Sequence, residues 1–311
     1  MPTRRDVFVR GAGLTAAAAL VGRTGEAFAA APMPKTPLKF SMPKGACDCH
    51  THIFDPEHYP YAASRPYTPE PATIADVDAL HRALHIDRVV ISQPTVYGAD
   101  HACTLNAIKT IGPSARGVSA YVASTSSARL DELHRGGMRG IVVHDMSEYK
   151  DAAAQIGDRP WNIEVYVGLP KMAAFMEMAT ATNVTAKLTL FGGVRSAEDI
   201  HTPAFQTLLE LIRSGKVYVE LSAPTHISTQ EPGYADADSV FKALIAANPQ
   251  RMTWGSDWPH AKTLRGQVTP GIAPLENIDD AISLNVLARS TTGPDQLKLI
   301  MVENAARLYG F

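Results

Sequence analysis

The stretch CDCHTHIF, at residues 47–54, places two histidines at alternate positions of a short apolar run. In a β-strand, alternate side chains point to the same side, so this pattern predicts that Asp48, His50 and His52 share one face and that the two cysteines share the other. Two imidazoles at the carboxyl end of a barrel strand can hold a divalent metal or polarise a substrate carbonyl. Two structural or surface histidines would give the same pattern, so it needs support from elsewhere in the chain.

A second motif, WGSDWPH, occupies residues 254–260, at the end of another predicted strand. If this strand is the last of a closed barrel, it lies beside the first. Asp257 would then face His50 and His52 across the mouth, where its carboxylate could accept a proton from water. The alternative is that Asp257 only caps the helix that follows.

Short β-branched or apolar runs alternate with amphipathic stretches along most of the chain. This alternation is typical of βαβ units and predicts the α/β class, as a single-domain (β/α)8 TIM barrel. A doubly wound open sheet is the alternative, but no GxGxxG motif follows the first strand. The predicted strands are 46–52, 88–93, 117–123, 140–145, 163–167, 187–191, 217–222 and 252–256. The clearest predicted helices are 74–84, 128–135, 171–180, 204–213 and 237–247.

The N-terminal thirty residues differ in character from the rest of the chain. Arg4 and Arg5 precede an Ala/Leu/Gly-rich stretch at residues 11–22, and Ala27 and Ala29 offer an A-x-A cleavage site. The paired arginines resemble a twin-arginine export signal. We therefore expect an export signal at 1–29, a linker at 30–45, the barrel domain at 46–311, and a periplasmic or otherwise exported location. An amphipathic N-terminal helix is the alternative.

The composition excludes several classes of function. The 311 residues carry a formal net charge of −2 and no basic block, so we expect no nucleic-acid partner and instead a small-molecule substrate. No apolar run is long enough to span a bilayer once the signal is removed. The three cysteines, an odd number, are expected to be buried structural thiols, with metal ligation as the alternative. The sequence leaves the oligomeric state open, and a homo-oligomer is compatible with it.

Five segments of the chain resemble one known family. Besides the two motifs above, they are IDRVVISQP at 86–94, GGMRGI at 136–141 and VENAARLY at 302–309. In this order they resemble the amidohydrolase-related family of the amidohydrolase superfamily, especially its branch of pyrone-dicarboxylate lactonases and sugar-lactone hydrolases. The resemblance spans nearly the whole chain after the N-terminal segment and implies a distorted TIM barrel.

By this resemblance the chain is a hydrolase acting on a lactone or a related cyclic ester or amide. Asp257 is the residue that would activate water, and His50 and His52 would polarise the carbonyl and stabilise the oxyanion. Tyr166 matches a tyrosine that contacts substrate in the lactonases, although packing at the rim is an equal alternative. The other residues expected at the mouth as substrate contacts are Thr95, Tyr97, His144 and His260.

Two departures from the family pattern bear on cofactor and substrate. Leu190 stands where members carry a histidine that contacts metal or substrate, so we favour a site without a cofactor; one zinc held by His50, His52 and Asp257 is the alternative. His144 or His201 could take the missing histidine's place. Val142 stands where dicarboxylate lactonases have an arginine, which indicates a less anionic or neutral substrate.

Two further features concern the interior and the rim of the barrel. Lys187 and Glu220 fall on neighbouring predicted strands and are expected to form an ion pair inside the barrel, whereas relatives often show a lysine in the place of Glu220. The Pro- and Tyr-rich segment at 55–71 follows the first strand and is expected to lie over the catalytic face.

Three functions remain open from the sequence. The first is a lactonase or related hydrolase without a metal, and the second is a zinc-dependent amidohydrolase or decarboxylase that uses the same residues as ligands. The third is a barrel that has lost hydrolysis and acts as an isomerase or as an exported ligand-binding protein, since a fold alone does not secure an activity.

Overall fold

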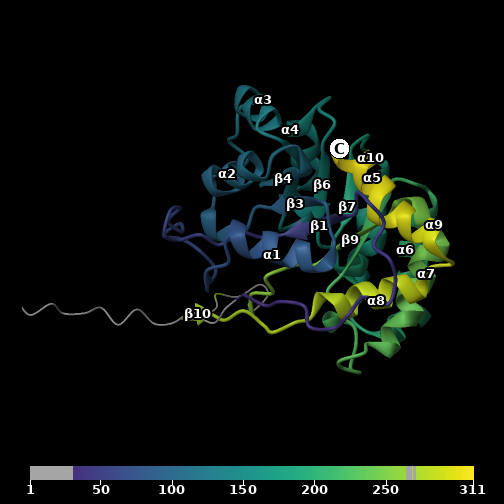
Figure 1. Ribbon diagram of the computed structural model, residues 1–311. Helices are drawn as coiled ribbons and strands as arrows, with labels where there is room; N and C mark the ends of the chain where they lie inside the picture. Colours follow the sequence, from purple (N-terminus) through teal and green to yellow (C-terminus); the bar gives the residue numbers. More distant parts are fainter. Residues whose placement is uncertain (1–30, 264–267, 269–270) are drawn as a thin grey trace, which may run out of the picture.

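The computed structural model describes residues 31–263, 268 and 271–311, so the predicted export signal lies outside the described residues. Eight parallel strands form one sheet in the order β1-β3-β4-β5-β6-β7-β8-β9 (Figure 1). The strands are β1 Cys47–Thr51, β3 Arg88–Ser92, β4 Ala115–Ala120, β5 Met138–Val143, β6 Asn162–Val165, β7 Thr185–Leu188, β8 Val217–Ser222 and β9 Met252–Gly255. The predicted α/β barrel of eight strands is thereby confirmed.

The first strand lies beside the segment that follows the last strand. The amide of Asp257 donates to the carbonyl of His50 at 2.9 Å, and the amide of His52 donates to the carbonyl of Trp258 at 2.8 Å. These two hydrogen bonds bring together the ends of β1 and β9, which carry the two sequence motifs.

Helices cover the outside of the barrel (Figure 1). α6 shows why the sequence forms them: the Thr202 hydroxyl accepts a hydrogen bond from the amide of Phe205, Pro203 suits the first turn, and the buried residues repeat at helical spacing toward the core. The helices are α1 Ile74–Leu84, α2 Ala102–Ile111, α3 Ser127–Arg135, α4 Tyr149–Ile156, α5 Met172–Thr180, α6 Pro203–Arg213, α7 Asp238–Ala247, α8 Asp280–Ser290, α9 Pro294–Lys298 and α10 Asn304–Tyr309.

The C-terminal residues close the amino end of the barrel. The Phe311 ring lies 4.9 Å from the guanidinium of Arg88 and 4.6 Å from that of Arg116, and both arginines stand near the beginnings of their strands. Tyr309 is fully buried and belongs to the cluster that fills the barrel interior. The active end is therefore the opposite one, where the strands end.

A bulge in β1 changes which side chains of this strand point into the barrel, compared with the prediction. The pairing of β1 with β3 slips between Asp48 and Thr51, so that two residues of β1 stand against one of β3. As a result Cys47 and Cys49 point into the barrel, where they join the interior apolar cluster, and the Asp48 carboxylate lies outside against His81 of α1 at 3.2 Å. The prediction that Asp48 shares a face with His50 and His52 was wrong, because simple alternation does not hold across an inserted residue.

Strand ends also differ from the predicted ones. β4 and β5 stop at Ala120 and Val143, three and two residues earlier than predicted. After β5, Asp145 accepts a hydrogen bond from the amide of Ser147 and begins a turn. A small parallel sheet pairs β2 Thr68–Pro69 with β10 Ile272–Ala273 and was not predicted. The three cysteines are buried and free, as expected.

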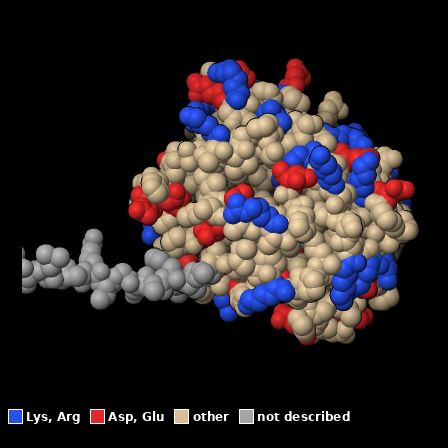
Figure 2. All heavy atoms as spheres, viewed as in Figure 1, with Lys and Arg blue, Asp and Glu red and all other residues tan. Residues whose placement is uncertain are grey.

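Charged side chains of both signs are interspersed over the face shown in Figure 2, with no large area of one charge. Among the described residues, no helix is both long enough and apolar enough to cross a membrane.

Candidate active site

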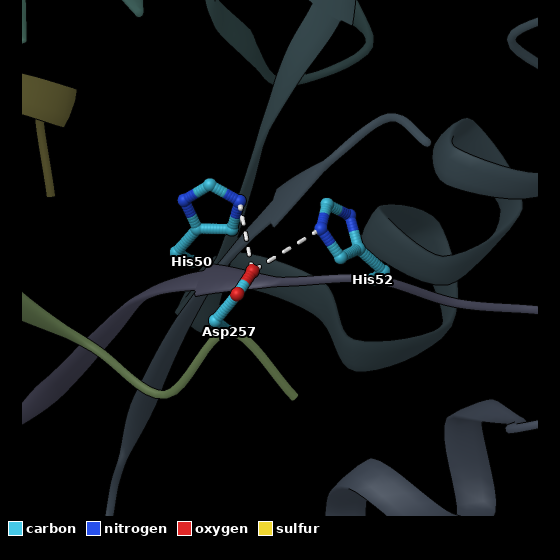
Figure 3. Close-up of side chains that lie close together, drawn as sticks. All are labelled: His50, His52 and Asp257. Carbon is cyan, nitrogen blue, oxygen red and sulfur yellow. Dashed lines mark ion pairs between the residues drawn. The ribbon is translucent and has the colours of Figure 1, made fainter. Parts of the chain in front are cut away.

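The structure brings His50, His52 and Asp257 together at the mouth of the barrel (Figure 3). One carboxylate oxygen of Asp257 lies 3.7 Å from Nε2 of His50 and 3.6 Å from Nε2 of His52. The two imidazole rings stand nearly perpendicular to each other with their centroids 5.0 Å apart. The three side chains therefore aim one polar atom each at a common point.

Local sequence features make this close approach feasible. A side-chain carbon at Gly255 would lie 2.7 Å from Cβ of His50, so only glycine lets β9 pass this close to the histidine. Asp48 stabilises the junction from outside, because its carboxylate accepts hydrogen bonds from the amides of His50 at 3.1 Å and Ser256 at 2.9 Å. The bulge and this carboxylate together fix how the end of β1 faces the end of β9.

Each imidazole is oriented through its second nitrogen. Nδ1 of His52 donates to the backbone carbonyl of Ser92 at 2.8 Å, and Nδ1 of His50 donates to the Glu220 carboxylate at 3.0 Å. A proton on Nδ1 leaves Nε2 of both rings directed at the mouth. Burial opposes the charged form of His50, but the carboxylates of Glu220 and Asp257 outweigh it and raise its pKa to about 9.

Asp257 stays ionised in this setting. Burial favours its neutral form, but the hydrogen bond with His52 and the charges of His50, His52 and His260 hold its pKa well below the usual range. Its backbone has a φ of 66°, in the left-handed region that few residues other than glycine adopt. Such a conformation is retained where the surroundings impose it, and here the amide bonded to His50 does so.

Below the reaction centre lies a row of buried charges. Nζ of Lys187 pairs with Glu164 at 2.8 Å and with Glu220, and all three side chains are fully buried. The Tyr309 hydroxyl donates to Glu164 at 2.8 Å. The predicted contact between Lys187 and Glu220 is confirmed. Glu164 and Tyr309 were missed, although Glu164 could have been noticed as an acidic residue at an inward position of an apolar strand.

The donor set fits a divalent metal. His50, His52 and Asp257 each offer one ligand atom, and these atoms lie within 4.8 Å of one another. Both imidazoles carry the outer hydrogen bond that metal-binding histidines usually make. Three protein ligands with an open position are the usual arrangement of catalytic zinc. Neither His144 nor His201 belongs to this cluster of possible metal ligands.

Leu190 follows β7 in a turn. It begins the turn Leu190–Gly193, in which Leu190 and Phe191 both have positive φ. The predicted strand at 187–191 therefore ends early. Leu190 is buried.

The predicted substrate contacts are distributed around the mouth. His144 and Tyr166, beyond the ends of β5 and β6, line a hollow of about 290 Å³. The Tyr97 hydroxyl accepts a hydrogen bond from the amide of Asp55, and His260 is buried with Nε2 3.1 Å from Asp280, so both polar groups are already engaged. These roles stay predictions.

The segment at 55–71 reaches the mouth through Tyr67, which the sequence analysis did not single out. Burial raises the pKa of Tyr67 to about 12, and a hydrogen bond with Thr95 acts in the opposite direction. The charge of Asp257 also raises this pKa, and the Tyr67 ring lies 6.4 Å from the ring of Phe54, which in turn lies 6.1 Å from the ring of His52. The position of Tyr67 in the expected rim segment was the available signal.

Comparison with known proteins gives several relatives that are similar over most of the chain. A 4-sulfomuconolactone hydrolase of Rhizobium radiobacter is 29% identical and covers 88% of this chain and 93% of its own length. A 2-pyrone-4,6-dicarboxylate hydrolase of Comamonas testosteroni is 27% identical, covering 87% and 92%. A D-galactarolactone isomerase of Agrobacterium fabrum is 24% identical, covering 76% and 84%.

Solved structures share the fold. A putative 2-pyrone-4,6-dicarboxylic acid hydrolase of Pseudomonas putida superposes with a TM-score of 0.72 at 24% identity, covering 86% of this chain and 97% of its own. An amidohydrolase of Burkholderia multivorans with bound zinc has a TM-score of 0.61 at 17% identity, covering 86% and 99%. The family model described as Amidohydrolase matches residues 47–190 and 191–311, which is the whole barrel. The predicted resemblance is confirmed, and this chain is an enzyme of the amidohydrolase family.

Proposed function

We propose that this chain hydrolyses a lactone with water activated by Asp257 and with a carbonyl polarised by His50 and His52. The supporting observation is the convergence of both Nε2 atoms on one carboxylate oxygen, at 3.7 Å and 3.6 Å. A space between a carboxylate and two imidazoles suits a water molecule on one side and a carbonyl oxygen on the other. Two of the similar proteins, from Rhizobium radiobacter and Comamonas testosteroni, are named as hydrolases of 4-sulfomuconolactone and of 2-pyrone-4,6-dicarboxylate.

The reaction follows from the charges of these groups. Ionised Asp257 takes a proton from water while the oxygen of that water attacks the lactone carbonyl carbon. Negative charge then develops on the carbonyl oxygen, where His50 donates Nε2–H because its raised pKa keeps the ring protonated at neutral pH. As the ring C–O bond breaks, the departing oxygen takes the proton held by Asp257, which leaves a hydroxy acid.

We propose a lactone that is neutral or carries little negative charge. Val142 is an apolar residue inside the barrel, so β5 offers no guanidinium to a carboxylate there. Lys171 lines the hollow with Asp145, and Arg195 lines an adjoining hollow of about 360 Å³ with Asp199. Each cation thus shares its space with an acidic side chain, which reduces its attraction for an anion.

A zinc-dependent hydrolase is the second candidate, because the donor set fits a catalytic metal and the similar Burkholderia multivorans amidohydrolase holds zinc. In that case His50, His52 and Asp257 would be the ligands, and the metal would polarise the carbonyl and lower the pKa of water. Ser92 and Glu220 would still orient the two imidazoles through their Nδ1 atoms. An isomerase is the third candidate, motivated by the galactarolactone isomerase among the relatives.

The deciding experiment compares metal-depleted wild type with Asp257→Asn on a panel of neutral and anionic lactones. We expect turnover by the wild type and a loss on the order of 10²–10⁴-fold in kcat in the variant. Asp158→Asn, which changes an exposed turn residue, is the matched control and should keep full activity. Turnover that returns only with zinc would favour the second candidate. Conversion without ring opening, or binding without turnover, would contradict lactone hydrolysis.

We also propose that the chain is exported through its N-terminal segment. The support is the pair Arg4 and Arg5, the apolar stretch after them and the A-x-A site. We expect an exported protein whose N-terminus lies near residue 30, determined by N-terminal sequencing, and retention in the cytoplasm after Arg4→Lys with Arg5→Lys. Export of that double variant at the wild-type level would contradict a twin-arginine route.

A further inference from the structure

A continuous chain of hydrogen bonds and ion pairs links the closed end of the barrel to the reaction centre. It runs from the Tyr309 hydroxyl to Glu164, from Glu164 to Lys187, from Lys187 to Glu220, and from Glu220 to Nδ1 of His50. Every member below His50 is fully buried. The last link is the one that touches a residue of the site.

We propose that Glu220 is a positioning residue for lactone hydrolysis, which accepts the hydrogen bond of Nδ1 of His50 and thereby directs Nε2 at the substrate. The expected effect on catalysis rests on the proposed function, whereas the orientation of His50 by Glu220 does not. An imidazole ring can rotate about its side-chain bonds and so turn Nε2 away from the mouth. A carboxylate 3.0 Å from Nδ1 removes this freedom, because it accepts the Nδ1–H hydrogen bond in one orientation of the ring.

Glu220 is itself held in place on both oxygens. Oε2 accepts from Lys187 and from His50, and Oε1 accepts from the Ser222 hydroxyl at 2.8 Å. Nζ of Lys187 also donates to the carbonyl of Cys49 at 3.0 Å, one residue before His50. The carboxylate therefore cannot turn away from the imidazole without losing several buried hydrogen bonds at once.

The role of Lys187 follows from the order of the charges. Glu164, Lys187 and Glu220 alternate in sign, and the two carboxylates would repel each other if the ammonium were absent. When Glu220 alone loses its charge, Lys187 still pairs with Glu164 at 2.8 Å. Glu220→Gln and Glu220→Leu should consequently fold, so that an effect on the site can be separated from an effect on the barrel.

The test measures the ring nitrogens of His50 by long-range ¹H–¹⁵N NMR, with the signals assigned by their absence in His50→Asn. In the wild type we expect a protonated Nδ1 whose proton exchanges slowly with water. Glu220→Gln keeps an acceptor without charge, so this proton should exchange faster and kcat should fall about 10-fold with little change in KM. Glu220→Leu removes the acceptor, and we expect loss of the slow proton and a fall in kcat of about 100-fold.

Ser222→Ala is the matched control, because it removes a hydrogen bond from the same carboxylate but leaves the oxygen that faces His50. The Nδ1 signal should persist in this variant. An unprotonated Nδ1 in the wild type, or the same Nδ1 signal in Glu220→Leu as in the wild type, would overturn the proposal. The NMR measurement needs no substrate, so it tests the role of Glu220 separately from the proposed function. Absence of lactone hydrolysis would refute the proposed function, whereas only the Nδ1 signal decides whether Glu220 orients His50.

Discussion

The two sides of the barrel interior differ sharply in chemistry. One side, contributed by β6, β7 and β8, carries Glu164, Lys187 and Glu220, and the other side, contributed by β3, β4 and β5, carries valines. Both sides are buried, and only Val142 among these residues is as much as 9% exposed. Because apolar side chains suffice to fill one side, the charges of the other side are not needed merely to build a barrel.

The charged side is costly to maintain. Each buried ion loses its hydration, and a buried network of charges is often no more stabilising than apolar residues of similar volume. Its contact with His50 gives a functional reason for its presence, whereas the valine side chains of the other side have no polar group that could orient an imidazole. Substitutions on the charged side are therefore expected to alter both stability and catalysis, and substitutions on the valine side to alter stability alone.

The largest effect that tests this difference is expected for Lys187→Met. Removal of the ammonium leaves the carboxylates of Glu164 and Glu220 facing each other without a cation, so the free energy of unfolding should fall by about 3–5 kcal/mol. Activity per folded molecule should fall as well, because Glu220 loses the partner that holds it against His50. Urea unfolding and kcat measured on the folded fraction check the two parts.

Val118→Ala on the other side is the matched comparison. It removes two methyl groups from a fully buried site, so we expect a loss of about 2 kcal/mol and an unchanged kcat. If kcat fell equally in both variants, the two sides of the barrel interior would not differ in their effect on catalysis. If Lys187→Met kept the wild-type stability, the charged side would not be a coupled network.

The barrel was predictable because its signals are local and repeated. Eight apolar runs separated by amphipathic stretches specify eight strands, and two motifs on the first and last strands specify where His50, His52 and Asp257 meet. The orientation of Asp48 was not predictable in this way. A bulge depends on how β1 pairs with β3, and that pairing is a property of two segments 40 residues apart.

The network beneath the site was only partly predictable, for a related reason. Lys187 and Glu220 lie on neighbouring strands, so their contact follows once the strand order is known. Tyr309 comes from a C-terminal helix that closes the barrel, and nothing local in its sequence reports which strand it will touch. Leu190 belongs to a turn with positive φ that an apolar run does not reveal.

Tyr309→Phe is expected to give the smallest effect and to show how far from His50 a substitution in the buried network still changes kcat. The variant removes one hydrogen bond to Glu164, whose other oxygen already has no hydrogen-bond partner among the described residues. Stability should fall by about 1.5 kcal/mol, since Lys187 still compensates the charge of Glu164. The kcat should stay unchanged, because two ion pairs separate Tyr309 from Glu220. A fall in kcat as large as that in Glu220→Gln would mean that the whole network, and not Glu220 alone, controls His50.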